Sequence, residues 1–180
     1  HRGDVLVLND GSLDGNVDYV RGVTALHPRV RLVEQPTNQG KGNAVKRGVL
    51  EARGRYVLFT DADGATPIAE LDNLLSAIGE RAEIAIGSRR LVSTEAERER
   101  TGLRELMGKV FYSVVNFLAV PGIHDTQCGF KLFRTDVARE LFRDLNESGW
   151  AFDVELLYRA QLFGYGIAEV PVNWQEVAGS

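Results

Sequence analysis

The side chains best suited to chemistry begin with an acidic pair, Asp61 and Asp63, which follows a buried strand predicted over residues 55–60. Ligands of open α/β sheets bind beyond the carboxyl ends of the strands. Two carboxylates at such a point repel each other unless a cation joins them, and a divalent hard metal would also neutralise a diphosphate leaving group. A solvated turn that caps the next helix is the alternative, and the pair alone does not decide between the two.

Two further loops carry candidate ligands. Residues 9–12, Asn-Asp-Gly-Ser, close another predicted strand, so that Asp10 could accept hydrogen bonds from a ribose or a base, or simply serve a turn. Residues 38–43, Asn-Gln-Gly-Lys-Gly-Asn, place Lys41 between two glycines directly before a predicted helix, where free backbone amides favour anions. The spacing is not that of a Walker loop, and a flexible loop is an equal alternative.

The elements that must position these loops alternate along the chain. Short apolar runs predict strands and amphipathic runs predict helices, which is typical of an α/β domain with a largely parallel sheet. We therefore expect one domain over residues 1–180, folded as a three-layer α/β/α sandwich in which Asp10, Lys41 and Asp63 converge at one sheet edge. The predicted strands cover residues 4–8, 30–33, 55–60, 82–87 and 167–174, with a short strand within 125–133, and the predicted helices include residues 43–52, 71–78, 106–120, 135–142 and 152–163.

Composition sets limits on the class of protein. The chain has 180 residues, 44% of them hydrophobic and 26% charged, which fits a globular fold with a sizeable core. The net charge of −4 gives no basic field for nucleic acid. Cys128 is the single cysteine, so an internal disulfide framework is excluded. We find no apolar run of membrane-spanning length, and the three scattered histidines suggest no metal cluster.

Taken together, the motifs carry a resemblance. The order Asp-Gly-Ser, Asn-x-Gly-Lys-Gly and Asp-x-Asp resembles the inverting family 2 glycosyltransferases of the GT-A fold. Gly-Ser-Arg at 87–89, Asp-Thr-Gln-Cys-Gly-Phe-Lys at 125–131, and the segments 150–155 and 172–174 are similar to the dolichyl-phosphate glucosyltransferase and polyprenyl-phosphate mannosyltransferase group. The resemblance covers essentially the whole chain.

On the donor side, the resemblance implies a nucleotide-sugar site. Asp10 would contact the nucleoside, and Lys41 would lie near it or near the diphosphate. Asp61 and Asp63 would hold Mg²⁺ or Mn²⁺ on the diphosphate. Arg89 would bind phosphate, for which a guanidinium is well shaped.

On the acceptor side, Arg104 and Lys131 would bind the phosphate of a lipid. Asp125 and Asp153 are the candidate catalytic carboxylates, Asp125 with a positioning role. In relatives with a hydroxyl acceptor, an Asp near the position of Asp153 acts as the general base, although Asp153 could instead cap its helix. A phosphate acceptor is already anionic, so positioning and charge neutralisation can suffice. We interpret Cys128 as a packing residue.

The implied activity is transfer of a hexose to a polyprenyl or dolichyl phosphate, with UDP-glucose as the favoured donor and GDP-mannose as the other candidate. The alternatives are a saccharide hydroxyl acceptor or a non-catalytic binding fragment. The apolar helix predicted over residues 106–120 would belong to the core or would lie on a membrane surface. In the second case the protein would make peripheral contact with the cytosolic face of a membrane. The strand–helix unit that normally opens the family has no counterpart here, so the chain is expected to be truncated relative to it.

Overall fold

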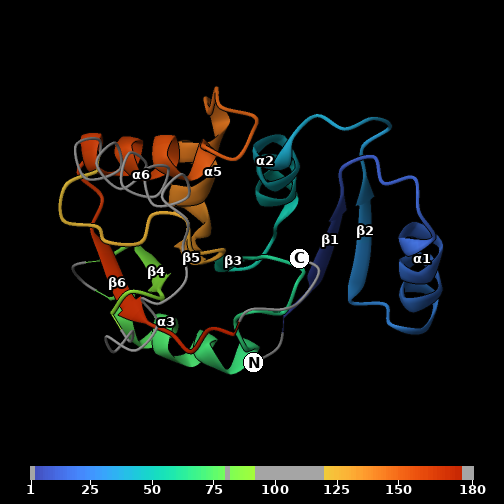
Figure 1. The fold of residues 1–180 in the computed structure, drawn as a ribbon, viewed down its shortest axis with the longest axis horizontal. Helices are drawn as coiled ribbons and strands as arrows, with labels where there is room; N and C mark the ends of the chain where they lie inside the picture. Colours follow the sequence, from blue (N-terminus) through green and yellow to red (C-terminus); the bar gives the residue numbers. More distant parts are fainter. Residues whose placement is uncertain (1–2, 80–81, 92–119, 176–180) are drawn as a thin grey trace, which may run out of the picture. The chain divides into compact units, whose positions relative to one another are not determined.

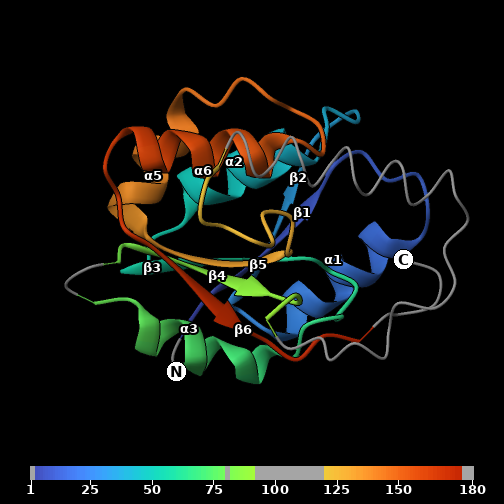
Figure 2. The same ribbon diagram turned by 60° about the vertical axis from the view of Figure 1, so that its left-hand side comes forward.

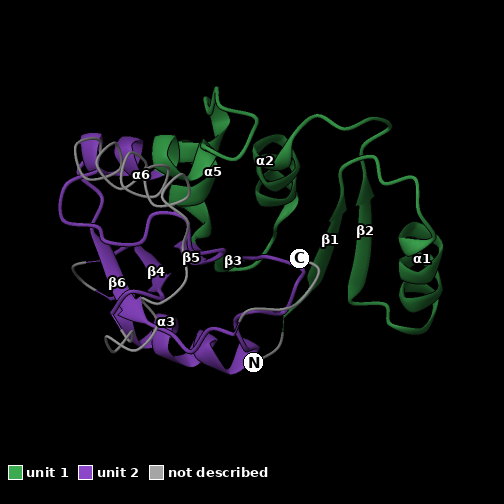
Figure 3. Ribbon diagram, in the orientation of Figure 1, with its two compact units in different colours: residues 1–57, 134–156 green, residues 58–133, 157–180 purple. Residues whose placement is uncertain are grey.

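A computed structural model describes residues 3–79, 82–91 and 120–175. The helix predicted over residues 106–120 falls almost wholly outside these residues. The chain forms two compact units, one of residues 1–57 and 134–156 and one of residues 58–133 and 157–180 (Figures 1 and 3).

The first unit contains a two-stranded parallel sheet. Its strands are β1 (Val5–Asn9) and β2 (Val30–Glu34). Helix α1 (Asn16–Leu26) packs against β2, and α2 (Lys41–Glu51) packs against β1 and against α5 (Thr135–Arg143). Figure 1 shows the two strands between α1 and α2. Helix α2 buries Ala44, Val45 and Val49, which lie on one helical face as their spacing predicts.

The second unit is built on a mixed sheet with the strand order β3-β5-β4-β6. The strands are β3 (Tyr56–Thr60, which begins in the first unit), β4 (Ile84–Ser88), β5 (Phe130–Arg134, whose last residue belongs to the first unit) and β6 (Ile167–Pro171). β4 pairs parallel to β6 and antiparallel to β5. The 3₁₀ helix η1 (Ile68–Glu70) leads into α3 (Leu71–Ala77), which packs against β4 and β6, and α6 (Phe152–Leu162) connects the units. Figure 2 shows α3 on one face of β4 and β6 and the C-terminal part of α6 on the other.

The α/β class and most element positions are confirmed. These predictions were correct because the apolar periodicity of the segments is strong. Three details differ from expectation. The sheet is mixed because β5 runs antiparallel to β4. The helix predicted over residues 71–78 is preceded by a 3₁₀ turn, which follows Pro67 in extended backbone and is closed by the bond from the N–H of Glu70 to the Pro67 carbonyl. The last strand ends at Pro171 rather than at residue 174. The N–H of Val172 still donates to the Ser88 carbonyl at the end of β4, but Asn173 and Gln175 bond outside the sheet, to Glu70 and Ala65.

Candidate functional site

Three polar segments of the second unit meet at one edge of the four-stranded sheet. Asp61 follows β3 and Arg89 follows β4. Strand β5 begins at the same edge, since it is antiparallel to β4 and the N–H of Asp61 donates to the Gly129 carbonyl at 2.9 Å. The loop 125–129 therefore enters the edge where the predicted donor residues stand, which is where ligands of such sheets bind.

Arg89 and Asp125 form a two-pronged ion pair at this edge. Arg89 Nε donates to Asp125 Oδ2 and Nη2 to Oδ1, both at 2.8 Å, and the Arg89 backbone N–H donates to Oδ2 at 3.0 Å. Asp125 is only 3% exposed. Burial disfavours the charged carboxylate, but the hydrogen bonds and charge of Arg89 outweigh burial and hold the pKa of Asp125 below its ordinary value. Asp125 is thus ionised and engaged in holding Arg89, the geometry of a positioning residue.

The acidic loop is shaped by its neighbours. Asp63 is exposed, and its Oδ1 accepts the N–H of Ala65 at 3.0 Å, which closes the turn and leaves Oδ2 for another partner. Asp61 is half-buried and its carboxylate lies against Gly129, where a Cβ atom would collide with Oδ2. A glycine is therefore required at position 129 of the 125–131 motif, because any side chain there would collide with the Asp61 carboxylate.

Lys131 and Cys128 lie beneath this edge rather than on it. Lys131 is fully buried in β5, with Nζ donating to the Cys128 carbonyl at 2.6 Å and lying 5.9 Å from the ring centroid of Phe59. Burial, followed by the nearby charge of Asp125, raises the pKa of the Cys128 thiol to about 11. These environments agree with Cys128 as a packing residue and place the Lys131 charge next to the Asp125 carboxylate.

In the first unit, Asp10 organises the loop that precedes α2. Its Oδ1 accepts the N–H of Gln39 at 2.8 Å, and its Oδ2 accepts the N–H of Gly40 at 2.9 Å. Gly11 has φ of +78°, and a Cβ there would lie 2.6 Å from the backbone nitrogen of Asn38. The two loops that the sequence singled out thus form one assembly, and Asp10 gains a structural function that sequence spacing did not show.

Lys41 stands at the start of α2 under an aromatic ring. Its Nζ lies 4.5 Å from the ring centroid of Trp150, which is 73% exposed. The loop that carries Trp150 is tied down by Glu155, whose carboxylate accepts the N–H groups of Asn146 and Glu147, and its Ser148 carbonyl accepts the N–H of Gly42 at 2.7 Å. The Lys41 ammonium is therefore presented beside an exposed aromatic face.

Asp153 is buried in the first turn of α6. Arg104 lies outside the described residues. The convergence of Asp10, Lys41 and Asp63 joins residues of both units and stays a prediction, as do the catalytic and phosphate-binding roles.

Sequence reasoning missed Glu169. It lies in β6, almost buried, and its carboxylate accepts the backbone N–H groups of His124 and Asp125 and faces His124 Nδ1 at 2.9 Å. A signal was present, because an acidic residue inside an otherwise apolar strand is rarely buried without partners. The partners lie more than 40 residues away in the sequence, so no local spacing could name them.

The acidic loop fits a divalent cation whose ligands would come partly from the protein and partly from a substrate. Asp61 and Asp63 offer hard carboxylate oxygens, which Mg²⁺ and Mn²⁺ prefer. Within the described part of the chain, no group of three or more His, Cys, Asp or Glu side chains could hold a metal alone. Two carboxylates leave most coordination positions for water and phosphate oxygens, as binding through a diphosphate requires.

The fold is that of the GT-A nucleotide-sugar transferases. Glucosyl-3-phosphoglycerate synthase from Mycobacterium tuberculosis, solved with UDP, matches with a TM-score of 0.66 at 20% identity over 97% of this chain and 61% of that one. A mannosyltransferase from Pyrobaculum calidifontis, solved with GDP-Man and Mn²⁺, matches with a TM-score of 0.62 at 20% identity over 93% of this chain and 45% of that one. These likenesses confirm the predicted fold.

The chain belongs to glycosyl transferase family 2, whose family pattern matches residues 3–142. Its relatives include dolichyl-phosphate beta-glucosyltransferases from Drosophila melanogaster (44% identical), Trichomonas vaginalis (43%) and Homo sapiens (40%). Each match covers 98% of this chain and between 54% and 57% of the relative, so the chain spans little more than half their length.

Proposed function

We propose that this protein transfers glucose from UDP-glucose to dolichyl phosphate or a similar polyprenyl phosphate, with inversion. The observation that carries the proposal is the identity of 40–44% over 98% of the chain to relatives that bear one activity in their names. The sheet edge that holds Asp61, Asp63 and Arg89 supplies groups suited to a diphosphate.

In this proposal, a phosphate oxygen of the acceptor attacks the anomeric carbon of glucose. The bond from that carbon to the diphosphate oxygen breaks, and UDP leaves with the electron pair. Asp61 and Asp63 would hold the metal, which when bound neutralises charge on the diphosphate. Arg89, kept in place by Asp125, would contact a phosphate through Nη1, the nitrogen that the ion pair does not use.

The acceptor side rests on fewer described residues. Arg104 and Lys131 remain the proposed partners of the lipid phosphate. Since Lys131 is buried next to Asp125, its contribution would be a charge beneath the site rather than an exposed contact. No helix among the described residues is long and apolar enough to cross a bilayer. We propose contact with the cytosolic face of a membrane, where a lipid phosphate would be met.

The donor half of the proposal is tested by calorimetric titration of Mn²⁺ with and without UDP. We expect weak binding of Mn²⁺ alone and clearly tighter binding with UDP, because the nucleotide completes the coordination shell. Asp63→Asn should weaken Mn²⁺-dependent UDP binding by at least about tenfold. Asp18→Asn, which alters an exposed carboxylate on α1, is the matched control. Equal Mn²⁺ affinity with and without UDP would contradict shared coordination.

A further inference from the structure

Strand β6 and the residues after it reach the candidate site from the far side of β4. Glu169 pairs in register with Ile86, two residues before the end of β4. Its Oε1 accepts the N–H of Asp125 at 2.9 Å. Both of its oxygens accept the N–H of His124 at 3.1–3.2 Å, and Oε2 lies 2.9 Å from His124 Nδ1. One carboxylate therefore fixes the turn that carries Asp125, and Asp125 in turn fixes Arg89.

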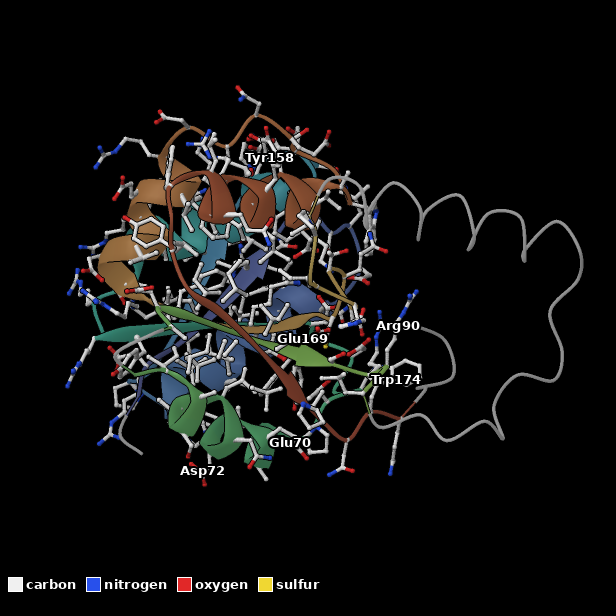
Figure 4. The ribbon with its side chains drawn as sticks, turned by 90° about the vertical axis from the view of Figure 1, so that its left-hand side faces the viewer. Glu70, Asp72, Arg90, Tyr158, Glu169 and Trp174 are labelled. Carbon is white, nitrogen blue, oxygen red and sulfur yellow. The ribbon has the colours of Figure 1, made fainter. Side chains whose placement is uncertain are left out.

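Trp174 contacts the same arginine through its ring. The ring centroid of Trp174 lies 5.6 Å from Arg89 Cζ, and the side chain remains partly exposed. Figure 4 shows Glu169 and Trp174 at the end of the sheet where β4 finishes. A carboxylate in the guanidinium plane and an aromatic ring against it restrict both translation and rotation of the group.

The segment that carries Trp174 is itself anchored. The N–H of Val172 donates to the Ser88 carbonyl at 3.2 Å, and Asn173 Nδ2 donates to buried Glu70 at 2.6 Å. The N–H of Gln175 donates at 2.9 Å to the carbonyl of Ala65, in the turn closed by Asp63. Residues 172–175 thus tie the end of β4 to the acidic loop, which explains the Val-Asn-Trp motif that the predicted site left without a role.

We propose that Glu169 and Trp174 are positioning residues that set the Arg89 guanidinium for phosphate binding, Glu169 through Asp125 and Trp174 through its ring. The inference deepens the proposed function and rests on it for the ligand, a nucleoside diphosphate. The hold on Arg89 itself stands on the contacts above.

The test compares variants that remove each contact with variants that keep part of it. Glu169→Leu removes every acceptor, whereas Glu169→Gln keeps one. Trp174→Leu removes the aromatic face, whereas Trp174→Phe keeps it. Glu34→Gln, at an exposed ion pair, and Tyr19→Leu, at an exposed aromatic residue, are the matched controls. Thermal unfolding of each variant shows that it is folded at the temperature used.

The first readout is the solvent exchange rate of the Arg89 Nε–H, followed by NMR on ¹⁵N-arginine-labelled protein. The second is the affinity for UDP in the presence of Mn²⁺. In both leucine variants we expect exchange to rise and UDP affinity to fall, each by about tenfold, as for loss of one well-placed hydrogen bond. Glu169→Gln and Trp174→Phe should recover most of both, and the controls should match the unaltered protein.

Unchanged exchange at Arg89 in the folded leucine variants would overturn the proposal. So would equal losses in the leucine variants and their conservative counterparts. Faster exchange with unchanged UDP affinity would show that Glu169 and Trp174 position Arg89, and would contradict a phosphate-binding role of Arg89. Failure of the positioning proposal and failure of the proposed function would therefore be distinguishable.

Discussion

Asp125 shows how a buried charge is kept at the scale of one residue. An isolated carboxylate that is 3% exposed would be strongly disfavoured, yet Arg89 supplies two side-chain hydrogen bonds and a backbone N–H. The pKa of Arg89 is raised by the hydrogen bond with Asp125, against the opposing effect of burial, so both partners are charged at neutral pH. The pair is therefore an integral part of the folded structure.

Asp125→Asn should lower the free energy of unfolding by about 1–3 kcal/mol at pH 7, less than for a fully buried pair because the Arg89 side chain is 37% exposed. The pKa of Asp125 is lowered on folding from its ordinary 3.8, so its stabilisation is present above about pH 4 and lost as the pH falls further. Urea unfolding from pH 7 to pH 3 should show the difference between the two proteins shrinking with acidification. A difference that grew would contradict the ion pair.

Cys128 should be chemically inert in the folded protein. Burial and the neighbouring charge of Asp125 raise the pKa of the thiol to about 11, so almost none is thiolate at pH 8. A thiol reagent such as DTNB should react at pH 8 only in denaturant. Rapid reaction under native conditions, with unfolding excluded by circular dichroism, would show that the thiol is accessible and the packing interpretation wrong.

At the scale of single residues, the sequence predicted which polar residues follow the ends of strands, but it did not predict their hydrogen-bond partners. Asp61, Asp63 and Arg89 were recognisable because each follows a strand of strong apolar pattern. The partner of Arg89 is 36 residues away and the acceptor for the Asp125 N–H is 44 residues away. Only the pairing of β4 with β5 and β6 brings them together, and that pairing is set by tertiary packing.

At the scale of elements, the loop before α2 packs closely against the loop that carries Trp150. Gly40 has φ of +94°, and a Cβ there would collide with the Ser148 carbonyl, on the loop that carries Trp150. Gly164, after α6, has φ of +79° with open space around its missing side chain. The two glycines share a positive φ, which L side chains rarely adopt, but differ in their surroundings.

This difference gives a matched comparison. Gly164→Ala should lower the free energy of unfolding by about 1 kcal/mol, the cost of a side chain at positive φ. Gly40→Ala should cost at least about 2 kcal/mol, because the backbone must also move away from Ser148. Urea denaturation of the two variants measures both. Equal losses would mean that the contact between the loops is not restrictive.

Element positions were predicted well where periodicity was strong, as in α2, α5 and β4. The antiparallel direction of β5 was not predicted, since an apolar run reads the same in either direction. The 3₁₀ turn at Ile68–Glu70 was not predicted, because Thr66 and Pro67 satisfy the usual pattern of a helix start. At that turn, the buried Glu70 carboxylate accepts hydrogen bonds from the side-chain amides of Asn73 and Asn173.

At the scale of the whole molecule, the residues predicted to bind the nucleotide sugar are divided between the compact units. Asp10 and Lys41 belong to one, and Asp61, Asp63 and Arg89 to the other. The sequence predicted the order of these motifs and the α/β class, because both are written in local patterns. The division into units depends on contacts between distant segments, such as residues 134–156 with 1–57, and local patterns do not encode these.

The most direct test of the central claim is a product analysis with paired donors and acceptors. Purified protein with Mn²⁺ is given radiolabelled UDP-glucose or GDP-mannose, together with a short polyprenyl phosphate or a saccharide acceptor, and the organic-soluble lipid product is counted. We expect label in the lipid fraction with UDP-glucose and not with GDP-mannose, and we expect this label to be lost when the metal is chelated and in Asp63→Asn. Transfer to the saccharide, abolished in Asp153→Asn, or a lipid product from GDP-mannose alone, would contradict it.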